Sequence, residues 1–321
     1  TPDALKITPD GQLIFVANRF SNTVSVIDTD RNKVRKHIAV DREPTAIDIS
    51  PDGSLVAIAN HLPNSAAVDP HISARVTLIN RHTMEVLNHI KLTSGTHSLQ
   101  DIVFSKDGKY IYVSHILSRN QFPTTQLEHG WMNTNALSIL ETETMKHFTT
   151  VLLDNFDRGA ANPAGMGVSE DGYQLYIALS GVHELCIIDL PKMHAKLDAA
   201  KRESFTGKAA SRFNDIPSDL RFLYGINKKV AVRGKSPRHL AVTGKKVLVS
   251  AYFSSGLEIF KNLNETIEST VVSLGNEPEL NTVRRGEMYF SDASICFQQW
   301  QSCISCHPDA RSDGLNWDLL N

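Results

Sequence analysis

Residues 44–53 read PTAIDISPDG, and the same pattern is found at five places along the chain. An apolar run leads into a Ser-Pro-Asp-Gly sequence, in which Asp and Gly supply the tight geometry of a hairpin turn. A second apolar run, LVAIA at residues 55–59, follows the turn. The other four copies are PDALKITPDG at 2–11, DIVFSKDG at 101–108, PAGMGVSEDG at 163–172 and, with a shortened turn, PRHLAVTG at 237–244.

Each unit continues with further strand-like segments. A third strand is seen in TVSVID at 23–28 and RVTLIN at 75–80, and a weaker fourth in KVRKHI at 33–38. β-Branched residues and alternation favour strands over helices. Four short antiparallel strands form the blade of a β-propeller, so we predict an all-β fold with five visible blades over residues 1–274. A closed propeller commonly has more blades, and we expect the missing ones to lie beyond one or both ends.

The repeats are separated unevenly, and we expect the extra residues to lie in loops at 61–74, 116–135 and 191–236. The last of these contains a partly helical stretch at 192–202. The second carries GWMNTN at 130–135, and Trp131 and Met132 rarely lie in a solvated loop without a packing partner. We expect this loop to cover another part of the chain or a partner, the alternative being a loop folded on its own blade.

The repeats resemble the YVTN family of bacterial β-propellers, which is named after its second-strand sequence. The equivalents here are FVAN at 15–18, AIAN at 57–60 and YVSH at 112–115, with the third strand VSVIDT at 24–29. The resemblance covers about residues 1–275 and implies the propeller fold. It implies no particular function, because propellers carry many unrelated activities.

The composition is that of an ordinary globular protein. Of 321 residues, 41% are hydrophobic and 21% are charged, and the formal net charge is −2 with a pI of about 6.6. Such a balance offers no broad basic surface, so nucleic acid is not expected as a partner. No run of about 18 uncharged apolar residues occurs, so no transmembrane segment is expected. The chain has no initiator Met and no signal-peptide pattern, and we expect it to be a piece of a longer precursor.

After Leu274 the strand pattern gives way to a segment whose centre is CISCH at 303–307. Two thiols at this spacing add to the vinyl groups of a haem, and the adjacent His coordinates its iron. We therefore predict a covalently attached haem c on Cys303 and Cys306, with His307 as the proximal iron ligand. The alternatives are an incidental pair of cysteines or half of a zinc site, which would need two further ligands at short spacing.

The other two cysteines have simpler interpretations. Cys186 lies in the apolar run LCII at 185–188 and is read as a buried, inert thiol. Cys296 lies seven residues before Cys303, and we read it as a packed thiol under the haem, with a redox role or a disulfide as the alternative. Four cysteines are too few for a disulfide scaffold.

The surroundings of CISCH add a second resemblance. RGEMYFSD at 285–292, followed by CISCH, looks like the entry to a haem domain of bacterial di-haem cytochrome c peroxidases, and PDARSDGLNWD at 308–318 is similar to propeller–cytochrome fusions of that superfamily. The change of pattern after Leu274 indicates a linker at 275–280, and the resemblance implies the start of a small α-helical cytochrome c-like domain at 281–321. It also implies peroxidase-like or oxidase-like chemistry. A second haem motif, a calcium site and a sixth iron ligand would lie beyond Asn321, so calcium has no support within this chain.

Propeller sites usually lie at the mouth of the central channel. Aligning the blades places Asn18, Asn60, His115, Ser180 and Tyr252 in equivalent positions, and Asp3, Thr45, Gln100, Ala164 and Arg238 in a second equivalent set. We expect both sets to ring one end of the channel. His61, His97 and His239 are near this rim by sequence, and could converge on a metal or ligand, the alternative being ordinary surface or turn histidines. The channel-mouth candidates are therefore Asn18, Asn60, His115, Arg238, His239 and Tyr252.

Two functions are compatible with these features. The first is a haem c-dependent redox enzyme whose propeller binds a small-molecule substrate or a redox partner protein. The second is a non-catalytic electron carrier or binding protein with the propeller as docking platform. Haem attachment of this kind implies a periplasmic or secreted bacterial protein. The linker is too short to let the haem segment swing freely, so we predict that residues 281–321 pack on an end or edge of the propeller, with the Trp131 loop at 116–135 as their contact.

Overall fold

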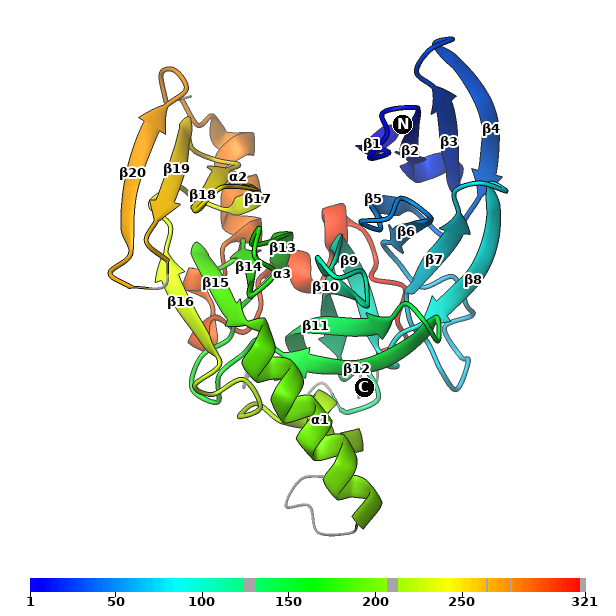
Figure 1. The fold of residues 1–321 in the computed structure, drawn as a ribbon. Helices are drawn as coiled ribbons and strands as arrows, with labels where there is room; N and C mark the ends of the chain where they lie inside the picture. The colour runs from blue at the N-terminus through cyan, green and yellow to red at the C-terminus, as the bar shows by residue number, and fades with distance from the viewer. Residues whose placement is uncertain (124–130, 207–212, 264, 278, 318–321) are drawn as a thin grey trace.

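The computed structural model describes residues 1–123, 131–206, 213–263, 265–277 and 279–317. Its strands form five four-stranded antiparallel sheets, each made of consecutive strands (Figure 1). The first two sheets contain β1 (Pro2–Ile7), β2 (Leu13–Asn18), β3 (Thr23–Asp28), β4 (Lys33–Ala39), β5 (Pro44–Ile49), β6 (Leu55–Asn60), β7 (Arg75–Asn80) and β8 (Glu85–Lys91).

The other three sheets repeat this plan. They contain β9 (Thr96–Phe104), β10 (Tyr110–Ser118), β11 (Asn133–Glu141), β12 (Lys146–Leu152), β13 (Pro163–Val168), β14 (Gln174–Leu179), β15 (Glu184–Asp189), β16 (Asn227–Ala231), β17 (Pro237–Thr243), β18 (Lys246–Ala251), β19 (Gly256–Lys261) and β20 (Glu268–Ser273). The prediction of an all-β chain with five four-stranded blades is therefore confirmed.

The repeated turn explains why the first two strands of a blade pair. In the second blade the backbone N–H of Leu55 donates to the Ser50 hydroxyl at 2.9 Å, and the N–H of Gly53 donates to the Ser50 carbonyl at 2.8 Å. Asp52 accepts from the backbone N–H of Ser54 at 3.1 Å, and Gly53 has φ of 73°, which glycine adopts without strain. The same contacts recur around Thr8, Ser105 and Ser169.

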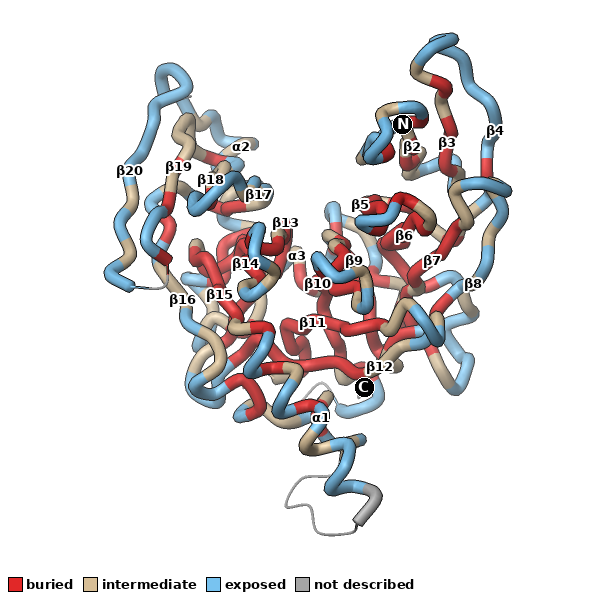
Figure 2. The backbone as a smooth tube through the Cα atoms, in the orientation of Figure 1, coloured by how far each residue is buried: buried red, intermediate tan, exposed pale blue. Residues whose placement is uncertain are grey.

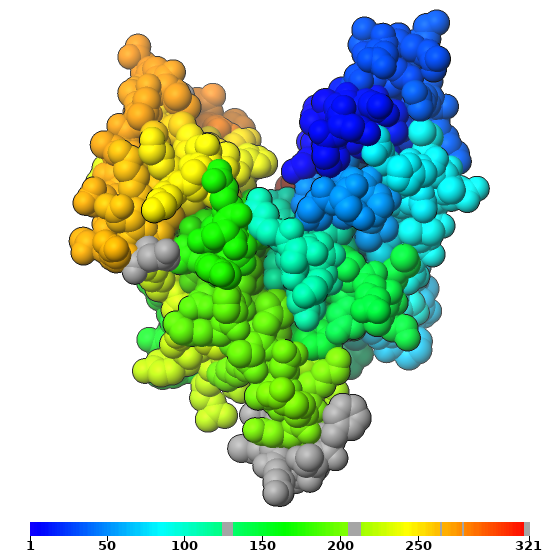
Figure 3. Space-filling model, viewed as in Figure 1, coloured from blue at the N-terminus to red at the C-terminus, as the bar shows by residue number. Residues whose placement is uncertain are grey.

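The first strands of the blades lie side by side around a central axis. β1 contacts β5, β5 contacts β9, β9 contacts β13, and β13 contacts β17. The five sheets form an arc, and Figure 3 shows the first sheet (blue) and the fifth (yellow to orange) on opposite sides of an open gap. The strands nearest the axis can therefore present their ends to one shared space.

Apolar side chains fill the spaces between neighbouring blades. One cluster, with Phe15, Val26 and Ile58, joins the first blade to the second, and others join each later pair. Figure 2 shows the middle of the molecule as mostly buried, and the outer strands β4 and β20 as mostly exposed. Burying one large apolar side chain contributes about 1.5–3 kcal/mol, so these interfaces hold the arc together.

Helices are few. α1 (Leu190–Thr206) follows β15, and its Met193 and Leu197 are buried in the cluster between the third and fourth blades, which confirms the helical stretch expected at 192–202. The C-terminal segment contains α2 (Thr282–Ser291), α3 (Cys303–Cys306) and short 3-10 turns. In the described part of the chain no helix is long and apolar enough to span a membrane.

The C-terminal segment packs on the propeller, as predicted. The backbone N–H of Gly159 donates to the carbonyl of Gln298 at 2.9 Å, and the N–H of Ala293 donates to the carbonyl of Gly181 at 2.8 Å. The expected loop contributes through Asn120 and Asn135, whose amides donate to the carbonyls of Asn316 and Trp300 at 3.2 and 3.0 Å.

Trp131 itself packs edge-on against Phe122 of its own loop, with ring centroids 5.6 Å apart. Residues 124–130 of the predicted loop lie outside the described residues. The polar side chains of the loop, rather than Trp131, therefore provide the contacts that the structure places on the C-terminal segment.

Candidate functional site

Helix α3 holds the CISCH sequence in a fixed arrangement. The Ser302 N–H donates to the Ser305 hydroxyl at 3.0 Å, which caps the start of the helix, and the His307 N–H donates to the Cys303 carbonyl at 3.0 Å. The side chain of Asn162, just before β13, accepts a hydrogen bond from the Ser305 hydroxyl at 2.7 Å and donates one to the Ser302 hydroxyl at 2.8 Å. The helix is therefore clamped to the fourth blade by its serines.

The residues present fit a c-type haem. Cys303 and Cys306 are free thiols one helical turn apart, with His307 directly after them. Cys303 and His307 are exposed, and neither side chain forms a hydrogen bond or ion pair with another described residue. Within the described residues no group of three or more His, Cys, Asp or Glu side chains is placed to hold a bare metal ion.

Cys306 faces the propeller. The amide of Asn133, at the start of β11, donates to its sulfur at 3.0 Å and to the side-chain oxygen (Oε1) of Gln301 at 3.0 Å. Burial raises the pKa of Cys306 to about 11. The oxygen of Asn133 accepts from the Ser118 hydroxyl, which also lies 2.7 Å from Nε2 of His97. A buried polar chain therefore leads from the third blade to this sulfur.

The other two thiols make no disulfide. Cys186 is completely buried, as expected, and burial raises its pKa to about 11. Cys296 is partly buried; burial, together with the neighbouring Cys303, raises its pKa.

A cavity of about 560 Å³ lies where the first strands of the blades meet the C-terminal segment. All five strand-start residues predicted as one ring line it: Asp3, Thr45, Gln100, Ala164 and Arg238. His61, His239 and Ser180 line it as well. The C-terminal segment contributes Ser291, Ile304, Pro308 and Asp309, so the cavity reaches one residue between the two cysteines and the two residues directly after His307.

The remaining residues of the other predicted ring are not part of this lining. Asn18 and Asn60 donate to Ser25 and Thr77 of the next strand at 2.8 and 2.9 Å, and His115 lies 2.8 Å from the Ser138 hydroxyl. Each of these three side chains is therefore held within its own blade by a hydroxyl group of the third strand. Tyr252 is exposed and stacks with Arg238.

Of the three histidines predicted near the channel rim, His61 and His239 line the cavity and His97 does not. His97 is completely buried and lies 2.9 Å from the Ser98 hydroxyl. Burial lowers the pKa of His97 to about 3, and that of His115 to about 3. Both are therefore neutral hydrogen-bonding groups inside the third blade at physiological pH.

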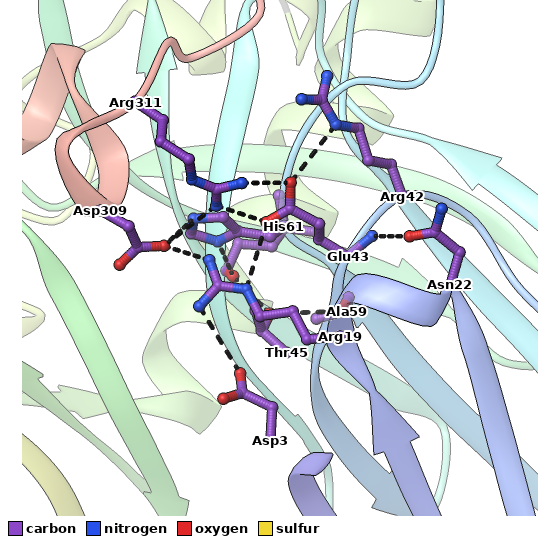
Figure 4. Close-up of polar contacts among 11 residues, drawn as sticks. Asp3, Arg19, Asn22, Arg42, Glu43, Thr45, Ala59, His61, Asp309 and Arg311 are labelled. Atoms are coloured by element: carbon purple, nitrogen blue, oxygen red, sulfur yellow. Dashed lines mark hydrogen bonds and ion pairs between the residues drawn. The ribbon is translucent and has the colours of Figure 1, made fainter. Parts of the chain in front are cut away.

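A charge network that the sequence did not predict joins the C-terminal segment to the first two blades. Figure 4 shows the Glu43 carboxylate between the guanidinium groups of Arg311 and Arg19. Arg311 donates to both oxygens of Glu43, at 2.9 and 2.6 Å, and Arg19 donates at 3.3 Å. Arg19 and Arg311 also pair with Asp309, two residues after His307.

The same network surrounds His61, which is buried at the cavity wall. Its Nδ1 lies 3.1 Å from the carbonyl oxygen of Leu99, and its Nε2 lies 3.7 Å from the Asp309 carboxylate. Burial, aided by the charge of Arg19, lowers the pKa of His61. The ring is therefore neutral and held in one tautomer by the main chain.

Asp101 is a further cavity residue with an altered acidity. Its oxygens accept from the backbone N–H groups of Ile102 at 2.9 Å and Met166 at 2.6 Å. Burial outweighs these bonds and raises the pKa of Asp101 to about 7. No short motif marks Arg19 or Glu43, and the repeat that begins at Asp101 gives no sign that its carboxyl is buried.

Comparison with curated proteins finds a relative by sequence. No family model matches the chain. Hydrazine synthase subunit beta of Kuenenia stuttgartiensis is 29% identical over 243 residues, which is 75% of this chain. The chain spans 59% of the length of that curated relative.

Solved structures support the fold. Kuenenia stuttgartiensis hydrazine synthase matches with a TM-score of 0.50 and 24% identity, over 85% of this chain and 83% of that one. A functionally unknown protein from Desulfotomaculum acetoxidans matches with a TM-score of 0.53 and 14% identity, over 88% and 73%. At these identities the likeness concerns the fold alone, and the resemblances to the YVTN and peroxidase families stay predictions.

Proposed function

We propose that this chain is part of a haem c-dependent redox protein whose propeller cavity receives a small molecule beside the haem. One observation carries the proposal. Helix α3 holds two free thiols one turn apart, with Cys303 and His307 exposed, and Ile304 and Pro308 from the same sequence line the cavity.

The roles of the chain's residues follow from their contacts. Cys303 and Cys306 would anchor the group and His307 would coordinate its iron, where haem c supplies one-electron transfer. Asn133 holds the Cys306 sulfur, and Asn162 holds the helix. Asp101, with a pKa of about 7, could exchange a proton with a bound molecule near neutral pH.

We extend the proposal to the assembly and its location. The sequence relative is named as a subunit, so we propose that this chain works within a multi-subunit redox enzyme. Haem attachment of this kind takes place outside the bacterial cytoplasm, and we propose a periplasmic or secreted location. A non-catalytic electron carrier is the alternative, and the cavity beside α3 favours the enzyme.

The test is covalent haem on the purified chain, made in a host with the cytochrome c maturation machinery. We expect a pyridine haemochrome spectrum and haem that survives acid–acetone extraction and denaturing gels. The double variant Cys303→Ala/Cys306→Ala should lose the covalent haem, and the control Cys296→Ala should keep it. Complete extraction of the haem from the wild-type chain would refute the proposal.

The enzyme and the carrier differ at the iron. An enzyme of the proposed kind needs an open iron face, so carbon monoxide should change the spectrum of the reduced protein. An unchanged spectrum, which indicates two protein ligands, would favour the carrier.

A further inference from the structure

Three cations line the cavity, and two of them are paired. Lys6 forms an ion pair with Asp48 at 2.8 Å, and Arg19 pairs with Glu43 and Asp309. Arg238 also lines the cavity, and no carboxylate of the described residues lies within 4.0 Å of it. The unpaired positive charge of the cavity is therefore that of Arg238.

The surroundings of Arg238 fix its orientation and leave its donors free. The guanidinium carbon lies 3.7 Å from the centroid of the Tyr252 ring, which is the distance of a stacked cation–π contact. Nε lies 3.4 Å from the Ser236 hydroxyl, at the long end of hydrogen-bond distances. The other N–H groups of Arg238 form no hydrogen bond with described residues. Stacking on one face directs these donors along the edge of the guanidinium plane.

Glu287 and Asp309 attract the charge of Arg238 from beyond ion-pair distance, and each is already paired. Arg284 of α2 stacks on the same Tyr252 ring at 4.1 Å and pairs with Glu287 at 2.8 Å. Asp309 lies beyond ion-pair distance from Arg238 and is already paired with Arg19 and Arg311. Keeping a half-buried cation without an ion-pair partner costs free energy of folding. The planar guanidinium group can donate two parallel hydrogen bonds to a carboxylate, which would supply that partner.

We propose that Arg238 binds the carboxylate of a small molecule in the propeller cavity. The ligand would lie between the fifth blade and the C-terminal segment, with the Ser180 hydroxyl, 2.8 Å from that of Ser236, as a further polar group. Its place beside a haem rests on the proposed function, whereas the binding itself does not.

The test is calorimetric titration of the full chain with acetate, and with acetamide as its neutral analogue of the same shape. We expect the wild type to bind acetate and not acetamide. Arg238→Gln should weaken acetate binding about 10- to 100-fold, because a two-point charged contact is lost. Arg238→Lys keeps the charge but loses the two-point geometry, and should weaken acetate binding less than Arg238→Gln does. The control Arg202→Gln changes an exposed residue of α1 and should leave acetate binding unchanged.

Several outcomes would overturn the proposal. These are equal acetate binding by wild type and Arg238→Gln, wild-type binding of acetamide as tight as that of acetate, or no acetate binding by the wild type. If circular dichroism shows that Arg238→Gln does not fold, Arg238→Lys decides, and unchanged affinity there overturns it. Haem content is measured on the same samples. Arg238-dependent binding by a chain without covalent haem would keep this inference and refute only the proposed function.

Discussion

Replacing Glu43 by glutamine should loosen the C-terminal segment from the propeller. The Glu43 side chain is 6% exposed and accepts three donor nitrogens, two from Arg311 and one from Arg19. Glutamine keeps the shape but removes the charge that faces the guanidinium groups of Arg311, Arg19 and, at 3.5 Å, Arg42. Hydrogen bonds to charged groups contribute about 1.5–3 kcal/mol each. Arg311 is 37% exposed, so water screens part of this interaction, and we expect a total loss of about 2–3 kcal/mol.

The assay is urea unfolding at pH 7 followed by circular dichroism, together with limited proteolysis mapped by mass spectrometry. Glu43→Gln should lower the free energy of unfolding and speed cleavage within residues 279–317. The control Glu85→Gln changes an exposed carboxylate of β8 and should stay within about 0.5 kcal/mol of wild type. If Glu43→Gln also stays within that range and is cleaved at the wild-type rate, the network does not hold the segment.

The same carboxylate predicts a pH dependence. Burial would raise the pKa of Glu43, but the hydrogen bonds and charge of Arg311, with the charge of Arg19, outweigh it and hold the pKa below its usual value of 4.5. The unfolded chain therefore binds a proton before the folded one as the pH falls. The contribution of Glu43 is present above about pH 5 and is lost as the pH falls through the folded pKa. Glu43→Gln should remove this part of the acid sensitivity.

Two further predictions concern the buried histidines of the third blade and the contact between Gly159 and the C-terminal segment. With folded pKa values of about 3 for His97 and His115, against about 6.5 unfolded, the unfolded state binds more protons below pH 6.5. Lowering the pH from 7 to 5 should therefore cost about 2 kcal/mol for each histidine in urea unfolding, and His115→Gln should reduce that slope; an unchanged slope would contradict the pKa assignment. A Cβ at Gly159 would lie 2.3 Å from Cα of Trp300, so Gly159→Ala should displace the C-terminal segment at a cost of about 1–3 kcal/mol. If protease cleaves Gly159→Ala at the same rate as the wild type, the contact between Gly159 and Trp300 is not tight.

The fold was predictable because its signals are local. Ser50, Asp52 and Gly53 form a turn with residues five apart or fewer, and Ser or Thr, Asp and Gly recur at the turns of the first, third and fourth blades. The strand-start ring was predictable for the same reason, since equivalent residues of repeated strands reach equivalent places. The CISCH sequence was equally visible, because its chemistry requires a fixed spacing.

What the sequence did not reveal depends on contacts between distant segments. Glu43 and Arg311 are 268 positions apart, and no motif marks either. Asn18 and Asn60 align with Tyr252, yet the first two turn into their blades and the third stays at the surface. Alignment identifies equivalent positions along a strand. Whether the side chain at such a position faces a cavity depends on the residues that surround it on the neighbouring strands.

The hydrogen bond from Asn133 to the Cys306 sulfur has a consequence for the order of biosynthesis. It joins residues 173 positions apart, and the clamp of Asn162 on Ser302 spans 140. Closing such long loops is slow, so α3 settles only after the third and fourth blades exist. Once it has settled, Cys306 is half-buried and held by Asn133, and burial raises the pKa of its thiol. Chemistry at Cys306 is therefore easiest while the segment is still loose, before the contact with Asn133 restricts access to the sulfur.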